Sequence, residues 1–175
     1  MPTGSDHAKA HAVLMAMIAL YCIVKAIPID PRDACSYRKQ GITEFQPDAS
    51  YYIGDNANVI PDGTRVIDLE SYLLPDLVIE VADTTLPDDI GQKRLLYEDL
   101  RITEYWILDV QETKIIAFSV NSEGTSQQIR QSKALLGLSL DLVTEALKRC
   151  KASNQSVGGA WLMAQLQSEI NPMIS

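Results

Sequence analysis

An acidic residue interrupts the most apolar segment of the chain, where Glu80 stands between Ile79 and Val81. Residues 77–81 have the composition of a strand that is buried on both faces. Burying a carboxylate without a partner is costly, so a carboxylate in such a strand is expected to be paired or to bind a metal. Glu80 is therefore the first candidate for a residue that does chemistry.

Two further residues could act together with Glu80. Asp48 follows Pro47 at the start of another predicted strand, and Lys93 stands in the first turns of the helix predicted after Glu80. Two carboxylates can hold Mg²⁺, which activates water and stabilises charge on a phosphate, and a lysine can orient or help deprotonate that water. The set suits metal-assisted phosphodiester hydrolysis. Its spacing is equally compatible with a structural salt bridge between Glu80 and Lys93.

The elements that must position these residues follow from hydrophobic periodicity and turn residues. Strands are predicted at 46–53, 77–81, 104–110 and 114–120, helices at 7–25, 88–100, 139–151 and 160–170, and a hairpin turn at Gly41. The segments 77–81, 88–100 and 104–110 form a parallel strand–helix–strand crossover. This order predicts an α/β fold in which helices flank a small mixed sheet.

Side-chain directions follow from the same periodicities. On the strand at 77–81, Asp76 and Glu80 share one face, because alternate side chains of a strand point to the same side. On the helix at 88–100, Leu95 and Leu96 are predicted to face inward, whereas Lys93 and Tyr97 can reach outward.

The charge of the chain is uneven. The 175 residues are 46% hydrophobic, which suits a single domain with a real core, and carry a net charge of −8. A uniformly acidic surface would argue against a nucleic-acid partner, because phosphates are contacted mostly by Lys and Arg. Residues 44–112, however, hold 16 of the 23 acids and four of the 15 bases. The acidic segment is either solvated surface or a carboxylate cluster for a divalent cation.

Cysteine usage and the N-terminus bear on localisation. Cys22, Cys35 and Cys150 form no CxxC pair, which favours free thiols in a reducing cytoplasm. Residues 12–24 form an apolar run of 13 residues, shorter than the roughly 20 that a membrane span needs. Without a positive flank or a good cleavage site, this run is predicted to be a core helix rather than a signal peptide. A cytoplasmic protein with no membrane segment is expected.

Several motifs occur in one order along the chain: Pro47-Asp48, then Pro75-Asp76-Leu77-Val78-Ile79-Glu80-Val81, then Asp89, Lys93 and Tyr97, then Glu104-Tyr105-Trp106-Ile107-Leu108-Asp109. They resemble the Uma-type family of restriction endonucleases, within the PD-(D/E)XK nuclease superfamily. The resemblance covers residues 7–150, and residues 151–175 would form a helical extension of the same single domain, 1–175. It implies a restriction-endonuclease-like core.

The resemblance also implies roles for individual residues. Asp48 matches the metal-binding aspartate of the superfamily, and Glu80 matches its second acid. Val81 would offer its backbone carbonyl to the metal. The usual lysine is absent, because Ala82 stands at its position, and Lys93 matches the place on the next helix to which the family's lysine has moved.

Two auxiliary acids are considered beside these residues. Asp76 matches a recurrent family position. Superfamily nucleases often add an acid from the first helix, and residues 12–24 contain none. Glu44 would lie on the strand face of Asp48, and could partly substitute, if the strand extended that far.

The resemblance supports two hypotheses of different classes. The first is a Mg²⁺-dependent endodeoxyribonuclease, with Mn²⁺ as an alternative metal, that hydrolyses DNA phosphodiester bonds as a homodimer. Asp48 and Glu80 would bind the metal, and Lys93 would position water or phosphate. The alternative is a catalytically impaired nuclease-fold module that binds nucleic acid or a protein partner. The missing first-helix acid and the acidic balance favour the alternative.

Other features have simpler interpretations. The i, i+4 pair His7 and His11 could bind a metal, but fraying and exposure at the N-terminus are expected. Trp106 is expected in the core rather than stacked on a base. Lys93, Arg94 and Arg101 could form a phosphate-facing strip, and helix charges paired with Glu98 and Asp99 explain them equally well.

Overall fold

The fold of the protein, described here from a computed structural model, is built on a six-stranded mixed sheet in the order β1-β4-β6-β7-β8-β9. The structure describes residues 4–83, 87 and 89–170. A smaller sheet has the order β3-β2-β5. The strands are β1 (Ile29–Asp33), β2 (Ser36–Lys39), β3 (Ile42–Phe45), β4 (Ala49–Ile53), β5 (Val66–Asp68), β6 (Leu77–Ala82), β7 (Glu104–Asp109), β8 (Lys114–Val120) and β9 (Ser126–Ile129).

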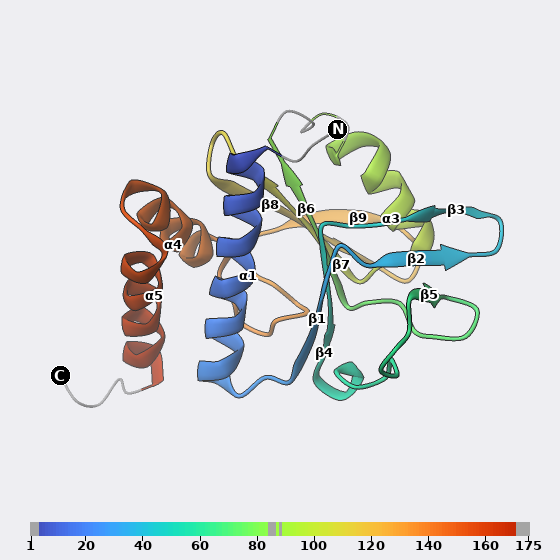
Figure 1. Ribbon diagram of the computed structural model, residues 1–175, viewed down its shortest axis with the longest axis horizontal. Helices are drawn as coiled ribbons and strands as arrows, with labels where there is room; N and C mark the ends of the chain where they lie inside the picture. Colours follow the sequence, from blue (N-terminus) through green and yellow to red (C-terminus); the bar gives the residue numbers. More distant parts are fainter. Residues whose placement is uncertain (1–3, 84–86, 88, 171–175) are drawn as a thin grey trace.

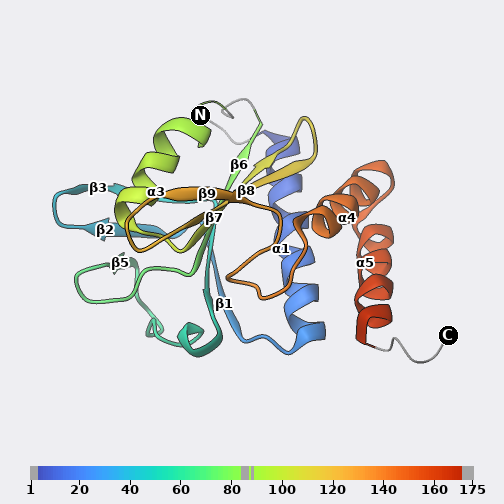
Figure 2. The same ribbon diagram turned by 180° about the vertical axis from the view of Figure 1, so that it is seen from behind.

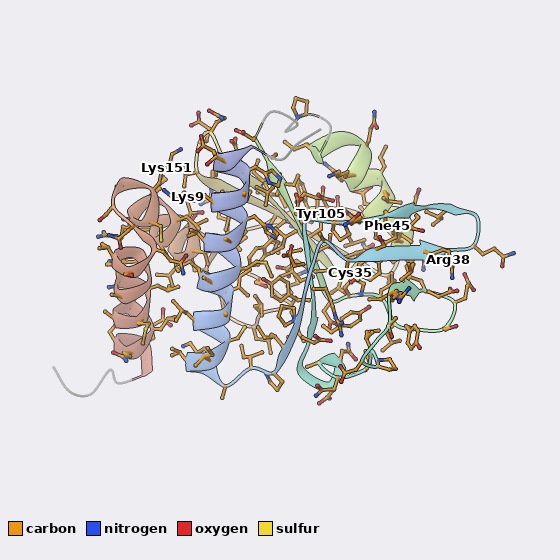
Figure 3. All side chains as sticks on the ribbon, viewed as in Figure 1. Lys9, Cys35, Arg38, Phe45, Tyr105 and Lys151 are labelled. Carbon is orange, nitrogen blue, oxygen red and sulfur yellow. The ribbon has the colours of Figure 1, made fainter. Side chains whose placement is uncertain are left out.

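Helices cover both faces of the large sheet (Figures 1 and 2). On one side lie α1 (Ser5–Lys25), α4 (Leu140–Ala152) and α5 (Gln155–Ile170). On the other side lie α3 (Arg94–Leu100) and the small sheet, and a π-helical turn, Asp89–Lys93, leads into α3. This confirms the predicted α/β architecture, in which helices flank a mixed sheet.

The strand β6 is buried on both sides and separates two hydrophobic cores. Ile79 and Val81 belong to the core under α1, α4 and α5. Val78 and Ala82 belong to the core under α3 and the small sheet. Since side chains alternate along a strand, Glu80 points to the second core, toward α3. The predicted central strand is therefore confirmed, and its one charge lies on the face that α3 covers.

The crossover around Glu80 also has the predicted form. β6 and β7 are parallel neighbours, in a register that pairs Glu80 with Ile107, and α3 connects them along the chain. The hairpin of β7 with β8 is confirmed too. The predicted helix at 88–100 is α-helical only from Arg94, and Asp88 lies outside the described residues.

Several elements differ from the sequence prediction because they are short or polar. No strand was predicted at 29–33, where Pro31 lies in β1, and this proline is tolerated because β1 is an edge strand of the sheet. β5 and β9 were not predicted. The strand predicted from residue 46 begins at Ala49.

The first helix packs against the protein rather than standing apart from it. By length and mean hydropathy α1 could cross a membrane, and it is the one such helix in the part of the chain that the structure describes. Its inner side chains, including Leu14, Met17 and Ile18, join the core with α4 and α5. The predicted core helix is therefore confirmed, although its outer face carries the exposed Ile23. All three cysteines are free.

Candidate active site

The site is centred on Glu80, whose side chain is 2% exposed. Lys93 donates a hydrogen bond from Nζ to Oε2 of Glu80 over 2.7 Å. Tyr97 donates a short hydrogen bond from its hydroxyl to the other carboxylate oxygen. The buried carboxylate thus has a cationic and a neutral donor, both supplied by the segment that follows β6.

The spacing of Lys93 and Tyr97 explains why they reach the same carboxylate. Residues four apart on a helix lie on one face, and Leu100 continues this face into the core. Tyr97 is 1% exposed, whereas Leu95 is 62% exposed. The prediction that Leu95 faces inward and Tyr97 outward is therefore wrong. The inward direction predicted for Leu96 is confirmed, because Leu96 packs against the core under α3. Hydrophobicity alone misplaced Leu95 and Tyr97, because the tyrosine on the inner face of α3 binds the buried Glu80.

Asp48 lies beside Glu80 across the sheet. The antiparallel register of β4 and β6 pairs Ala49 with Ile79, so position 48 falls opposite position 80. β4 begins at Ala49, and the Asp48 carboxylate takes the place of the next strand residue: its Oδ2 accepts a 2.7 Å hydrogen bond from the Val81 backbone N–H. The N–H and carbonyl of a strand residue point to the same side, so the carbonyl of Val81 also faces Asp48.

The electrostatics of the site depend on the burial of Glu80. Burial raises the pKa of Glu80 to about 7, because a charged carboxylate is poorly solvated there. The Lys93 charge and the hydrogen bonds from Lys93 and Tyr97 oppose this increase, and the nearby Asp48 charge adds to it. The structure thus brings together Asp48, Glu80 and Lys93. Tyr97 also belongs to this site, although it was not among the predicted site residues.

The donor set at this end of β6 fits a hard divalent cation. Asp48 and Glu80 offer carboxylate oxygens and Val81 offers a carbonyl, and Mg²⁺ prefers oxygen ligands. A cation would also offset the repulsion from Asp48, which adds to the effect of burial on the pKa of Glu80. Within the residues described, no three His, Cys, Asp or Glu side chains gather closely enough to hold a metal. The protein would therefore contribute few side-chain ligands, which is typical of Mg²⁺ sites completed by water and phosphate.

His7 also lies at this site, where the sequence predicted a frayed terminus. Its side chain is 19% exposed, and Nε2 lies 3.5 Å from Oδ2 of Asp48. His11, one turn further along α1, is likewise largely buried. The expectation of exposed, frayed histidines is therefore wrong. It failed because α1 packs against the sheet from its first turns, which nothing in the local sequence indicates.

The two auxiliary acids are not brought to the site. Asp76 directly precedes β6 and lies four residues before Glu80, roughly 13 Å away along the extended chain. Its carboxylate accepts hydrogen bonds from the Ile53 N–H at 2.7 Å and from Nδ2 of Asn56 at 2.9 Å. Glu44 is exposed on β3, in the small sheet. The idea that it extends the strand of Asp48 is wrong, because the chain leaves β3 after Phe45 and begins β4 at Ala49.

Replacing Asp76 by alanine should destabilise the fold without changing the cation site. The substitution leaves the Ile53 N–H and the Asn56 amide without their acceptor, which should cost about 1–3 kcal/mol. Urea unfolding measures this loss, and a Mn²⁺ titration of the folded variant should give the affinity of the wild type. A selective loss of Mn²⁺ affinity in a stable Asp76→Ala variant would contradict a purely structural role.

Other candidates have structural roles. Trp106 is fully buried in the core and donates a hydrogen bond to Glu104, as expected for a core residue rather than a base-stacking one. Arg94 binds Glu98 at 2.8 Å and lies over the ring of Phe118. The helix charges are therefore partly paired along α3, which supports the second of the two interpretations for Arg94.

Comparisons with known proteins identify the family and the fold. The family model described as "Putative restriction endonuclease" (Uma2) matches residues 1–150. Among solved structures, a protein from Anabaena variabilis described as a "putative nuclease belonging to DUF820" aligns with a TM-score of 0.55 over 84% of each chain, at 15% identity. Identity this low shows a shared fold only. No curated protein matches the chain. The chain belongs to the Uma2 family of restriction-endonuclease-like proteins.

Proposed function

We propose that the protein is a Mg²⁺-dependent endonuclease that hydrolyses DNA phosphodiester bonds. The observation that carries the proposal is the contact of Lys93 with the buried Glu80, directly across the strand register from Asp48. Metal-assisted phosphodiester hydrolysis requires carboxylates that bind the metal and a cationic group near the phosphate. The site near the end of β6 offers two carboxylates, one of them buried, and an ammonium group. The family membership supports the same reaction class.

Each residue has a defined part in the proposed reaction. Asp48, Glu80 and the Val81 carbonyl would hold the cation, which when bound lowers the pKa of water and neutralises charge on the phosphate. Lys93 is 42% exposed, so its ammonium can both contact Glu80 and reach solvent, where it would orient the attacking water or a phosphate oxygen. Tyr97 holds the Glu80 carboxylate in place from the buried side.

The acidic charge around the site limits unaided DNA affinity. Residues 44–112 carry most of the acids, and the flanking segments are net basic. A bound divalent cation changes the local field at the site, so we propose that DNA binding depends on the metal as well as on the basic flanks. Cutting both strands of a duplex requires two such sites, and we propose that a cytoplasmic homodimer supplies them.

The direct test is cleavage of supercoiled plasmid DNA in the presence of Mg²⁺ or Mn²⁺. The wild type should nick the plasmid, chelation should stop the reaction, and Glu80→Ala and Lys93→Met should each reduce the rate by about 10²–10³-fold. Glu112→Ala and Lys114→Met are matched controls, because both residues are exposed at the β7–β8 turn. Equal cleavage by the wild type and Glu80→Ala, or by neither, would reject this function.

A second candidate function is a catalytically impaired nuclease-fold module that binds nucleic acid or a protein. The observation that favours it is the small number of side-chain ligands: among the described residues, no group of three is gathered for a metal. Under this hypothesis the plasmid stays intact with every metal, while the wild type still retards labelled DNA in a gel without added metal. Cleavage by the wild type alone would reject it.

A further inference from the structure

The imidazole of His7 touches one of the two proposed cation ligands. His7 lies in the first turn of α1, and its Nε2 is 3.5 Å from Oδ2 of Asp48. The same oxygen accepts the hydrogen bond from the Val81 N–H at 2.7 Å. The Asp48 carboxylate is therefore held on one side by the backbone of β6 and faced by α1 on the other.

The opposite nitrogen of the His7 ring lacks a partner. Nδ1 is buried and has no hydrogen-bond partner in the part of the chain that the structure describes. A buried polar atom without a partner disfavours the folded state, and Nε2 of His11 is a second such atom on the same helix. The Asp48 carboxylate next to Nε2 favours the tautomer with its proton on Nε2, which leaves Nδ1 as a bare acceptor.

From these contacts we infer that His7 is a positioning residue of the cation site. Its Nε2, at 3.5 Å, and the Val81 N–H, which donates a hydrogen bond over 2.7 Å, contact Oδ2 of Asp48 from two directions and would leave Oδ1 to face the cation. Within the described residues Oδ1 has no hydrogen-bond donor, so it is available as a ligand. This inference rests on the proposed function, because it assumes that Asp48 binds the metal.

The inference assigns to the first helix a contribution that the sequence did not indicate. Superfamily nucleases often add an acid from this helix, and residues 12–24 contain none. The helix instead supplies an imidazole, which acts on the metal through the orientation of Asp48. Partners that orient a metal ligand typically change metal affinity by about 10–100-fold when they are removed.

The chain offers a matched control for His7. His11 lies one turn further along α1, is similarly buried, and has Nε2 at 3.7 Å from Oδ1 of Asp33. Asp33 ends the edge strand β1 and is not a proposed ligand. A His11 substitution therefore removes an imidazole–carboxylate contact of the same kind from the same helix without touching Asp48.

The test is calorimetric titration of each protein with Mn²⁺ alone, without DNA. His7→Ala should bind Mn²⁺ about 10–100-fold more weakly than the wild type. His7→Gln, whose amide can donate a hydrogen bond to Oδ2 from the same helix position, should recover most of the affinity. His11→Ala should bind like the wild type. Urea unfolding of all four proteins should show that His7→Ala is not less stable than His11→Ala.

The possible failures can be told apart. Wild-type affinity in His7→Ala would overturn the role of His7 and leave the proposed cation site in place. The same loss in His11→Ala as in His7→Ala would assign the effect to α1 as a whole and would also overturn it. Absence of Mn²⁺ binding by the wild type would overturn the proposed function itself.

Discussion

Replacing Glu80 by glutamine is expected to stabilise the folded protein above about pH 7 while removing its affinity for Mg²⁺. The substitution keeps the shape of the side chain and one acceptor oxygen, which can face Lys93, while its NH2 group can donate to the Tyr97 hydroxyl oxygen, and it removes the buried charge. The raised pKa means that the folded state disfavours the ionised form of Glu80. A site whose carboxylate is retained at a cost to stability is expected for function rather than folding.

The sign and the pH range follow from the two pKa values. Burial raises the pKa of Glu80 from 4.5 to about 7 on folding. The folded state therefore binds more protons than the unfolded chain between these values, and stability falls as the pH rises through this range. A shift of this size corresponds to about 3 kcal/mol. The stability of Glu80→Gln relative to the wild type should increase by about this amount between pH 4.5 and 8.

Urea unfolding across this pH range, with and without Mg²⁺, measures both effects. Mg²⁺ should raise the stability of the wild type increasingly as Glu80 ionises, because a metal binds the deprotonated carboxylate, and it should leave Glu80→Gln unchanged. A Glu80→Gln variant that loses stability relative to the wild type at high pH would contradict the burial argument. Equal stabilisation of both proteins by Mg²⁺ would exclude Glu80 as a ligand.

Replacing Glu104 by alanine should have the largest purely structural effect. Glu104 is fully buried in β7, and its carboxylate accepts hydrogen bonds from Nε1 of Trp106 at 2.5 Å and from the backbone N–H groups of Lys133 and Ala134 at 2.7 and 3.0 Å. Alanine leaves all three donors without an acceptor and detaches the segment before α4 from the sheet. We expect a loss of about 3–5 kcal/mol in the free energy of unfolding.

Two variants sharpen this test. Glu104→Gln should also be destabilised. The NH2 group of the glutamine would replace one of the two acceptor oxygens and would face an N–H group, which is itself a donor. Glu112→Ala, at an exposed position, should change the stability by less than about 0.5 kcal/mol. Both Glu104 variants, while folded, should bind Mn²⁺ like the wild type. A Glu104→Ala variant as stable as the wild type, or one that is folded but unable to bind the metal, would contradict this role.

The two buried glutamates show what sequence alone can separate. Both lie in apolar strands, but Glu80 interrupts its strand whereas Glu104 begins one, so only Glu80 stood out as a buried charge. Their partners decide their roles. Glu80 meets the side chains of Lys93 and Tyr97 next to a second carboxylate, whereas Glu104 meets two backbone amides and a core tryptophan. Apart from Trp106, the partners of each glutamate come from other elements of the fold than its own strand.

The sequence by itself determined the elements with strong local patterns and the residues on them. The apolar run at β6, the crossover to β7 and the β7–β8 hairpin follow from periodicities of a few residues, and so do the positions of Glu80 and Lys93. The short strands β1, β5 and β9 were missed because three to five polar residues carry little periodicity.

Only the tertiary structure decided which acids belong to the site. Asp48 reaches Val81 and Asp76 turns to Ile53 because of the register between β4 and β6, which depends on pairing over about thirty residues. Tyr97 faces inward, against its polarity, because Glu80 is buried beneath α3. His7 reaches Asp48 from the start of the chain, because α1 packs on the sheet. Strand register and the face that a helix buries are set by contacts between distant segments. A local sequence pattern does not predict these contacts.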